Sequence, residues 1–228
     1  MDIRTLADGK DPGSFSNRMR TRRFRVFEDL VGELKRPLRM LDVGGTNEFW
    51  EQRGWAGRDD VNITLLNLSA PPKKWQNIDG IAGDATDLSR YPDGTFDVVF
   101  SNSVIEHLFT HDRQVAMARE VGRVGRCYWV QTPNYWFPME PHFHVLGWQW
   151  LPESARVGLL RRRRCGWRGP CPDREKARDL VREVRLMTAG ELRRAFPEGT
   201  VLRERLAGLT KSFVVARGFP GLARNVQL

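Results

Sequence analysis

Apolar residues recur at helical spacing near the start of the chain and then gather in short runs that stop at glycine or proline. Between Ser16 and Leu34 they fall close to one helical face with arginines between them, which predicts an amphipathic helix. A second helical stretch covers 111–124. Short apolar runs, each predicted to be a buried strand, lie at 39–43, 63–68, 78–82, 96–101 and 127–131. Strands alternating with helices predict an α/β fold, a doubly wound sheet with its ligand at the carboxyl ends of the strands.

The last part of the chain has a different pattern. Thr188 opens a predicted helix and Glu191 follows it at capping-box spacing. Two β-rich runs, 201–205 and 212–215, flank the turn at Gly208 and predict a terminal antiparallel hairpin. We therefore expect a Rossmann-like, mainly parallel seven-stranded sheet that ends in this hairpin. The single domain of residues 1–228 divides into an N-terminal helix (1–37), a core (38–132), an inserted lid (133–187) and a C-terminal helix with the hairpin (188–228).

Charge is distributed unevenly along the 228 residues, whose formal net charge is +9. Residues 41–155 are acidic and both flanks are basic, so a cofactor with cationic character suits the middle and an anionic substrate or surface suits the flanks. The alternative explanation of the basic character is a composition bias toward arginine that has no functional role. The first helix places Arg18, Arg20, Arg22 and Arg23 on different faces, and some of them would reach a ligand.

The sequence also excludes several classes of protein. No apolar stretch approaches the ~20 residues of a membrane span, and the opening residues lack a signal-like apolar core, so we expect a cytoplasmic protein. The chain is long enough to bury a full core without disulfides. The cysteines, Cys127, Cys165 and Cys171, are odd in number and lack metal-ligand spacing, which predicts reduced thiols.

Glycine and polar residues follow the predicted strands where ligands bind such sheets. Asp42 and the turn Gly44-Gly45 end the first strand, and a turn without side chains lets a ligand approach the backbone. Asn67 ends the second strand, where a residue that binds ribose is expected. Asp84 ends the third and would accept a hydrogen bond from an adenine amino group. Taken singly, these features are also typical of an ordinary tight turn or a helix cap.

Taken together with the stretch from Phe96 to Leu108, these motifs resemble class I S-adenosylmethionine-dependent methyltransferases of the methyltransferase type 11 kind. The similarity covers 38–132 well and 200–217 loosely. It implies that S-adenosylmethionine is the cofactor and S-adenosylhomocysteine the product. The residues that it implies for cofactor binding are Asp42, Gly44, Gly45, Thr46, Asn67, Leu68, Asp84, Ala85, Asn102 and Ser103.

Two positions depart from the family pattern. Thr46-Asn47 stands where the family usually has a further glycine, and Asn67 replaces the usual Asp or Glu. Because a neutral amide makes weaker hydrogen bonds than a carboxylate, we expect modest cofactor affinity. A cofactor-binding scaffold without turnover is therefore one alternative function.

The acceptor is predicted from the loops beyond the fourth and fifth strands. The fourth-strand loop lacks the Asn/Asp-Pro-Pro-aromatic motif of related enzymes that methylate planar nitrogens, and it lacks a cysteine nucleophile. A hydroxyl acceptor needs a base. His107, or His142 and His144 in the next loop, would serve, and the His-x-His pair would share one face if extended. The alternative for His107 is a structural role at the start of a helix. Glu106 completes the catalytic candidates.

Glu106 and His107 also match the last two positions of the Glu-x-x-Glu-His run that holds a divalent cation in some metal-dependent O-methyltransferases. Ser103 occupies the first position, so one carboxylate is missing. Glu106, His107 and His144 would supply only part of a site, and hard cations prefer several oxygen ligands. We assign no metal ligands and keep a divalent metal as the less favoured alternative.

These observations favour an O-methyltransferase acting on a small-molecule or glycan hydroxyl, with an acceptor that carries an acidic group as one variant. The alternative with the same chemistry is methylation of the 2′-hydroxyl of RNA. Trp136, Trp148, Trp150 and Trp167 are predicted to be mostly lid core, and the alternative for some of them is to stack on a sugar or aromatic acceptor. The run Arg161–Arg164 is predicted to lie around a helix in solvent, or else to contact an acidic substrate or a membrane surface. The sequence makes no prediction of oligomeric state.

Overall fold

The computed structural model describes residues 15–223 and Leu228. Its helices and strands, in chain order, are α2 (Phe15–Gly32), β1 (Leu38–Val43), α3 (Asn47–Gln52), β2 (Val61–Asn67), β3 (Ile78–Ala82), β4 (Phe96–Asn102), α4 (His111–Val124), β5 (Gly125–Pro133), α5 (Glu153–Arg162), α6 (Arg174–Arg182), α7 (Ala189–Ala195), β6 (Thr200–Leu206) and β7 (Leu209–Arg217). Short 3-10 helices cover Ile105–His107, Trp148–Trp150 and Pro220–Ala223.

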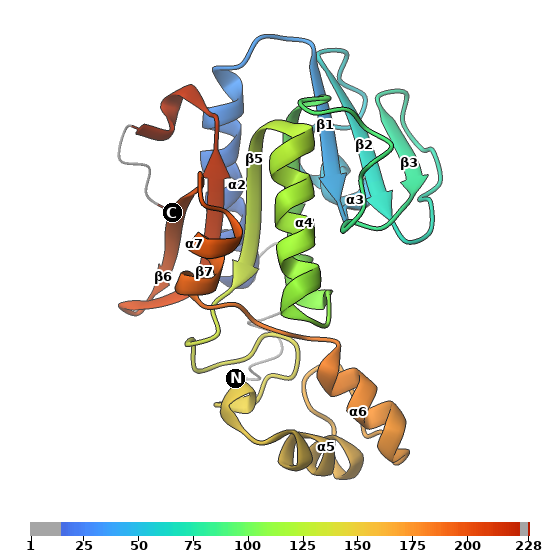
Figure 1. Ribbon diagram of the computed structural model, residues 1–228, viewed down its shortest axis with the longest axis vertical. Helices are drawn as coiled ribbons and strands as arrows, with labels where there is room; N and C mark the ends of the chain where they lie inside the picture. Colours follow the sequence, from blue (N-terminus) through green and yellow to red (C-terminus); the bar gives the residue numbers. More distant parts are fainter. Residues whose placement is uncertain (1–14, 224–227) are drawn as a thin grey trace.

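One seven-stranded sheet runs through the core in the order β3-β2-β1-β4-β5-β7-β6. β7 is antiparallel to both of its neighbours, and the other pairs are parallel. In Figure 1, α4 and α7 lie in front of the sheet and α2 lies behind it. The predicted Rossmann-like fold with a terminal antiparallel hairpin is confirmed.

Each face of the sheet buries its own hydrophobic cluster. Behind the sheet, Phe24 and Phe27 of α2 pack against Trp50, Trp55 and Phe100 with ring centroids 4.8 to 6.4 Å apart. These side chains are buried because α2 places its apolar positions on one face, as the periodicity predicts. Burial of each such side chain contributes about 1.5–3 kcal/mol.

The opposite cluster depends on α4, whose buried residues recur at helical spacing: Gln114, Met117, Ala118, Val121 and Val124. The hydroxyl oxygen of Thr110 accepts a hydrogen bond from the backbone of Arg113 and caps this helix. α7 covers the same face and begins at Thr188 with the predicted capping box, in which Thr188 and Glu191 bond each other's backbone. These two helices and α2 hold the strand ends in fixed positions.

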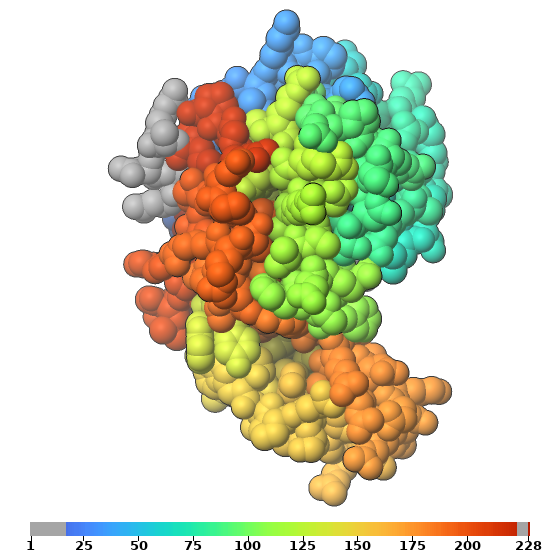
Figure 2. Space-filling model, viewed as in Figure 1, coloured from blue at the N-terminus to red at the C-terminus, as the bar shows by residue number. Residues whose placement is uncertain are grey.

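The lid has a hydrophobic cluster of its own, in which α5 and α6 pack around Phe143 and Trp148. The two rings are stacked with centroids 4.2 Å apart. The chain enters and leaves the lid at adjacent points, since Asn134 bridges Met187 and the Tyr135 amide donates to the carbonyl of Met187 at 3.1 Å. In Figure 2 the lid is the lower lobe, joined to the core by a narrower waist.

The remaining sequence predictions have mixed outcomes. α5 ends at Arg162, so Arg163 and Arg164 lie beyond the helix that was predicted to carry all four arginines. All four are exposed. The three cysteines are free thiols. Among the described residues, no helix combines the length and the apolar character needed to cross a membrane.

Candidate active site

The turn after β1 is shaped by the buried carboxylate of Asp42. Trp50 Nε1 donates a hydrogen bond to Asp42 Oδ2 at 2.7 Å, and burial raises the pKa of Asp42 to about 7 despite this bond. A Cβ on Gly45 would lie 1.7 Å from the same oxygen. A Cβ on Gly44, whose φ is +78°, would lie 2.4 Å from Val104. Both glycines are therefore required by packing, and the turn presents bare backbone at the edge of the sheet.

The next predicted cofactor residues surround this turn. Thr46 accepts from the Phe49 amide and caps α3, so its hydroxyl oxygen already serves the helix. Asn67 Nδ2 donates to the Gly45 carbonyl at 2.9 Å, which leaves the Asn67 amide oxygen as the group that would face a ribose. Leu68 is 84% exposed beside it, an apolar surface that an adenine ring would cover. Their contacts with a cofactor stay predictions.

Asp84 lies at the carboxyl end of β3 with both oxygens engaged. Oδ1 accepts from the amide and hydroxyl of Thr86, and Oδ2 accepts from Arg113 at 2.7 Å. Burial raises the pKa of Asp84, but these donors outweigh it and the net effect is a lower pKa. An adenine amino group would share this carboxylate with Arg113. Ala85 packs into the α4 cluster, and the role predicted for its amide is untested.

At the end of β4 the structure pairs the two predicted cofactor residues, Asn102 and Ser103, with Arg23 and Gln131. Asn102 accepts a hydrogen bond from Arg23 at 3.0 Å, and Ser103, with φ of 58°, donates to Gln131 at 2.8 Å. Arg23 is 8% exposed and also donates hydrogen bonds to both carboxylate oxygens of Glu204. Among the arginines of α2, this is the one that is buried. Gln131 was predictable in principle from its place near the end of the fifth strand.

Glu106 and His107 follow this loop and are both desolvated. Glu106 is 0% exposed, its Oε2 accepts from Thr132 at 3.0 Å, and its Oε1 has no hydrogen-bond partner among the described residues. Burial raises the pKa of Glu106 to about 7. His107 Nδ1 lies 3.5 Å from Glu183 without a hydrogen bond, and burial lowers the pKa of His107 to about 4. His107 is therefore neutral and weakly basic.

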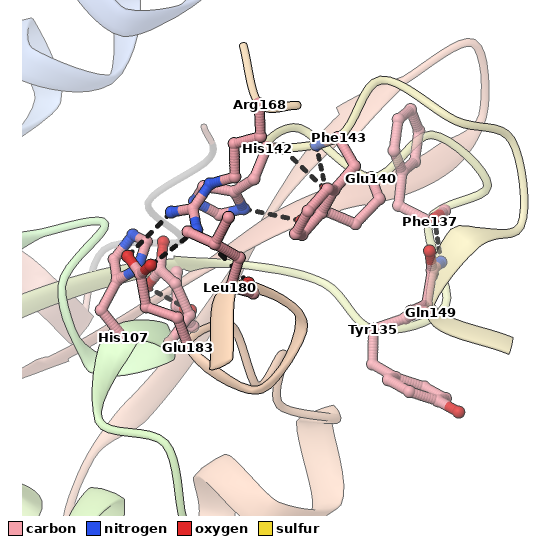
Figure 3. A network of polar contacts seen from close by, with 12 residues as sticks. His107, Tyr135, Phe137, Glu140, His142, Phe143, Gln149, Arg168, Leu180 and Glu183 are labelled. Carbon is pink, nitrogen blue, oxygen red and sulfur yellow. Dashed lines mark hydrogen bonds and ion pairs between the residues drawn. The ribbon is translucent and has the colours of Figure 1, made fainter. Parts of the chain in front are cut away.

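His142 has the opposite environment. Its Nδ1 lies 2.6 Å from Glu140, a buried carboxylate that also accepts from the amides of His142 and Phe143 (Figure 3). Burial lowers the pKa of His142, but the hydrogen bond and charge of Glu140 together with the charge of Glu106 outweigh it, so the pKa is raised. The rings of His142 and His107 meet edge to face, with centroids 4.8 Å apart.

The segment from His142 to His144 is not extended, so the condition under which both rings would share one face is not met. His144 has a left-handed backbone with φ of 49°, because the segment folds into a tight turn around Glu140. The ring of His144 packs edge-on against the ring of Trp167, with centroids 5.4 Å apart. His142 and His144 nevertheless line the same cavity.

This cavity of about 440 Å³ opens beside Ser103 and Gln131, at the end of β4 and β5. We call it the acceptor pocket. Its apolar wall comes from the lid, and three cationic residues of the core, Arg20, Arg23 and Lys211, also line it. Its other lining residues include Phe137, Met139, His142, His144 and Trp167.

One cluster among the described residues could hold a metal ion. Glu106, His107 and His142 each offer a ligand atom, and these atoms lie within 4.8 Å of one another. The sequence suggested His144 as the partial third group, but the fold brings His142 there instead. One carboxylate with two imidazoles suits a transition metal better than magnesium.

Comparison with known proteins supports the similarity of the central region to methyltransferases. A family profile described as a methyltransferase domain matches residues 42–126. The central region of this chain is a class I methyltransferase domain. S-adenosylmethionine is the cofactor of this class, and the residues predicted to hold it lie along the carboxyl edge of β1 to β4 in this methyltransferase.

Solved structures share the fold of this chain at low sequence identity. CurJ carbon methyltransferase is 13% identical with a TM-score of 0.56, over 94% of this chain and 57% of that chain. The 1,6-didemethyltoxoflavin-N1-methyltransferase of Burkholderia thailandensis, solved with S-adenosylhomocysteine, is 15% identical with a TM-score of 0.50, over 94% and 83%. Two uncharacterized proteins of Mycobacterium tuberculosis are 44% identical over 50 residues, which span 22% of this chain and 17% of theirs.

Proposed function

We propose that this methyltransferase transfers a methyl group to a hydroxyl oxygen of a small molecule or glycan bound in the acceptor pocket, with His142 as the base. The observation that carries the proposal is a combination of two properties in His142. Its ring lines the pocket, and its Nδ1 is held by the buried carboxylate of Glu140 at 2.6 Å. A carboxylate that fixes an imidazole in this way is typical of a general base.

When bound, S-adenosylmethionine supplies a methyl group on a sulfonium. The residues at the sheet edge fit this cofactor: the Gly44-Gly45 turn leaves its backbone open, and Asn67 keeps an amide oxygen for a ribose hydroxyl. Arg23 donates a hydrogen bond to Asn102 and would thereby help to fix the loop that follows β4, next to the acceptor pocket.

The proton balance follows from the charges around His142. As the acceptor oxygen gains the methyl group, its proton passes to His142 and from there to solvent. Glu140 and Glu106 stabilise the imidazolium, which is the effect that raises the pKa of His142. His107, with a pKa of about 4, is a much weaker base and is better suited to position the ring of His142.

The lining of the pocket favours a particular kind of acceptor. Phe137, Met139 and Trp167 offer apolar and aromatic surface to a planar ring or a sugar. Arg20 and Lys211 offer positive charge in the lining, and burial lowers the pKa of Lys211. A hydroxylated ring that carries a carboxylate combines these features.

The test is methyl transfer from S-adenosylmethionine to a panel of hydroxylated aromatic acids and acidic glycans. We expect His142→Gln to lower kcat by about 10²- to 10⁴-fold, the usual contribution of a general base. Calorimetric binding of S-adenosylhomocysteine should not change. His111→Gln, at the start of α4 and outside the pocket, is the matched control. Full activity in His142→Gln would reject His142 as the base.

A second candidate mechanism is metal-assisted methylation at the same pocket. It is favoured by Glu106 Oε1 and His107 Nδ1, which have no hydrogen-bond partner among the described residues. A cation on Glu106, His107 and His142 would activate the hydroxyl as a Lewis acid. Metal analysis of the purified protein, and activity after chelation and re-addition of zinc or manganese, separate the two mechanisms. Activity that survives complete chelation favours the histidine base.

The RNA alternative is tested in the same assay by ionic strength. Binding that depends on phosphates weakens steeply as salt rises, because counterions are released. Binding of a small acceptor with one acidic group should depend only weakly on salt concentration. Binding of S-adenosylhomocysteine without transfer to any acceptor would instead support the scaffold alternative.

A further inference from the structure

We propose that a second pocket, on the side of the lid that faces α4 and α7, binds a small organic anion through Arg156. This pocket has a volume of about 760 Å³ and opens at the waist between the lid and the core (Figure 2). We call it the waist pocket. Glu140 separates it from the acceptor pocket, because Glu140 lines the waist pocket while His142, to which it is bonded, lines the other. The site is therefore distinct from the one that holds the acceptor.

Arg156 is the residue that points to an anion. It lies on α5, half-buried, and its Nε is buried without a hydrogen-bond partner among the described residues. It makes no ion pair with the carboxylates of the described chain, although Glu153 and Glu140 attract it from a distance. Burial lowers its pKa, which reflects the cost of removing a guanidinium from water. An oxyanion would satisfy this group with charge-assisted hydrogen bonds.

The other charges of the waist pocket strengthen this inference. Four arginines line it against two glutamates. Arg185 is paired with Glu191, and Arg182 is paired with Glu153 outside the lining. Arg194, exposed on α7, has no such pair within the described part of the chain. Two unpaired guanidiniums therefore face one cavity.

The rest of the lining indicates an organic ligand rather than a bare ion. Phe109, Tyr135 and Trp148 contribute aromatic surface to the walls. Gln149 Nε2 donates hydrogen bonds to the carbonyls of Tyr135 and Phe137 in the lid loop, and its Oε1 is buried without a partner among the described residues. A ligand with an apolar body, a carboxylate or phosphate and one donor group matches these three features.

An anion bound in the waist pocket would link the lid to the core by contacts with both. Arg156 belongs to the lid, whereas Arg194 belongs to the core helix α7, and the lid packs around a hydrophobic cluster separate from those of the sheet. One anion that reaches both guanidiniums would hold the two parts together. We therefore expect the ligand to slow hydrogen exchange in α5 as well as to bind.

The experiment is calorimetric titration of the full chain with phenyl phosphate, benzoate and inorganic phosphate. We expect at least one of the two organic anions to bind and to lose 10-fold or more in affinity in Arg156→Gln, while Arg174→Gln, an exposed arginine of α6 outside the pocket, keeps full affinity. The two organic probes distinguish phosphate from carboxylate. Arg156→Lys, which keeps the charge, should retain part of the affinity and shows that the lid still folds.

Three results would overturn the proposal. The first is wild-type affinity in Arg156→Gln, and the second is absence of binding by both organic anions. The third is a loss of affinity in Lys211→Met, which lines the acceptor pocket instead and would place the anion there. Inorganic phosphate that binds as tightly as phenyl phosphate would overturn the part played by the aromatic wall. None of these readouts depends on methyl transfer.

Discussion

The side chain of Asp42 shapes the glycine turn after β1 and also makes the stability of the fold depend on pH. Its carboxylate is buried beneath the glycine turn, where Trp50 donates to it and Gly45 leaves room for it. Its pKa of about 7 means that near neutral pH the folded protein holds a large share of these carboxyls in protonated form. A group that positions the cofactor turn therefore also makes stability depend on pH.

The first prediction concerns Asp42→Asn. The pKa of Asp42 rises from 3.8 to about 7 on folding, so its contribution to stability is complete below pH 4 and is lost as pH rises through 7. The amide cannot titrate but still accepts from Trp50. Relative to wild type, the variant should gain up to about 4 kcal/mol between pH 4 and pH 8. Urea unfolding between pH 4 and pH 8 measures the difference in free energy of unfolding between the two proteins. If this difference stayed constant over the range, the prediction would be contradicted.

At the scale of elements, Arg23 ties three parts of the fold together. From α2 it binds Glu204 of β6 at 2.9 Å and Asn102 of β4 at 3.0 Å. Ser212 of β7 donates to the same Glu204 at 2.6 Å. Because Arg23 and Glu204 are both buried, removal of either partner leaves an uncompensated charge.

The second prediction is a double-mutant cycle on this pair. Arg23→Met should lower the free energy of unfolding by about 3–5 kcal/mol, because Glu204 is then left buried and charged. Arg23→Met combined with Glu204→Gln should recover a large part of that loss. Arg25→Met, exposed on the same helix, is the control. Chemical denaturation measures the wild type, Arg23→Met, Glu204→Gln, the double variant and the control. Additive effects of the two single changes would mean that the pair is not coupled.

Hydrophobic periodicity predicted α2 and α4 because each helix buries one face, and continuous apolar runs predicted the central strands because these are buried on both faces. The 111–124 helix and the 78–82 strand have the bounds observed for α4 and β3. Periodicity could not show which arginine of α2 is buried, since that depends on how the helix packs. It also missed the turn at Glu140, where one buried carboxylate accepts hydrogen bonds from the amides of His142 and Phe143 and His144 has a left-handed backbone. The groups of the site were thus predictable, but their pairing was not.

The whole molecule consists of a methyltransferase core and a lid with separate hydrophobic clusters. The acceptor pocket and the waist pocket lie on either side of the loop that contains Glu140. Because small local clusters open more readily than a large core, the lid is expected to unfold at lower free energy than the sheet.

The third prediction tests this difference with Trp148→Ala. Trp148 is buried and stacked on Phe143, so its removal should cost about 3–5 kcal/mol within the lid. Hydrogen exchange should accelerate in α5 and α6 and stay unchanged in β4 and β5. Equal acceleration in lid and sheet would show that the two parts unfold together.

The adjacent ends of the lid have an evolutionary consequence. Since Asn134 and Met187 are bridged across the base of the insertion, the intervening stretch can be exchanged for another without moving either end. The strands that carry the predicted donor site lie before this stretch in the chain. A lineage could therefore recruit new acceptors by replacing one continuous piece of its gene, while inheriting the machinery for the methyl donor intact.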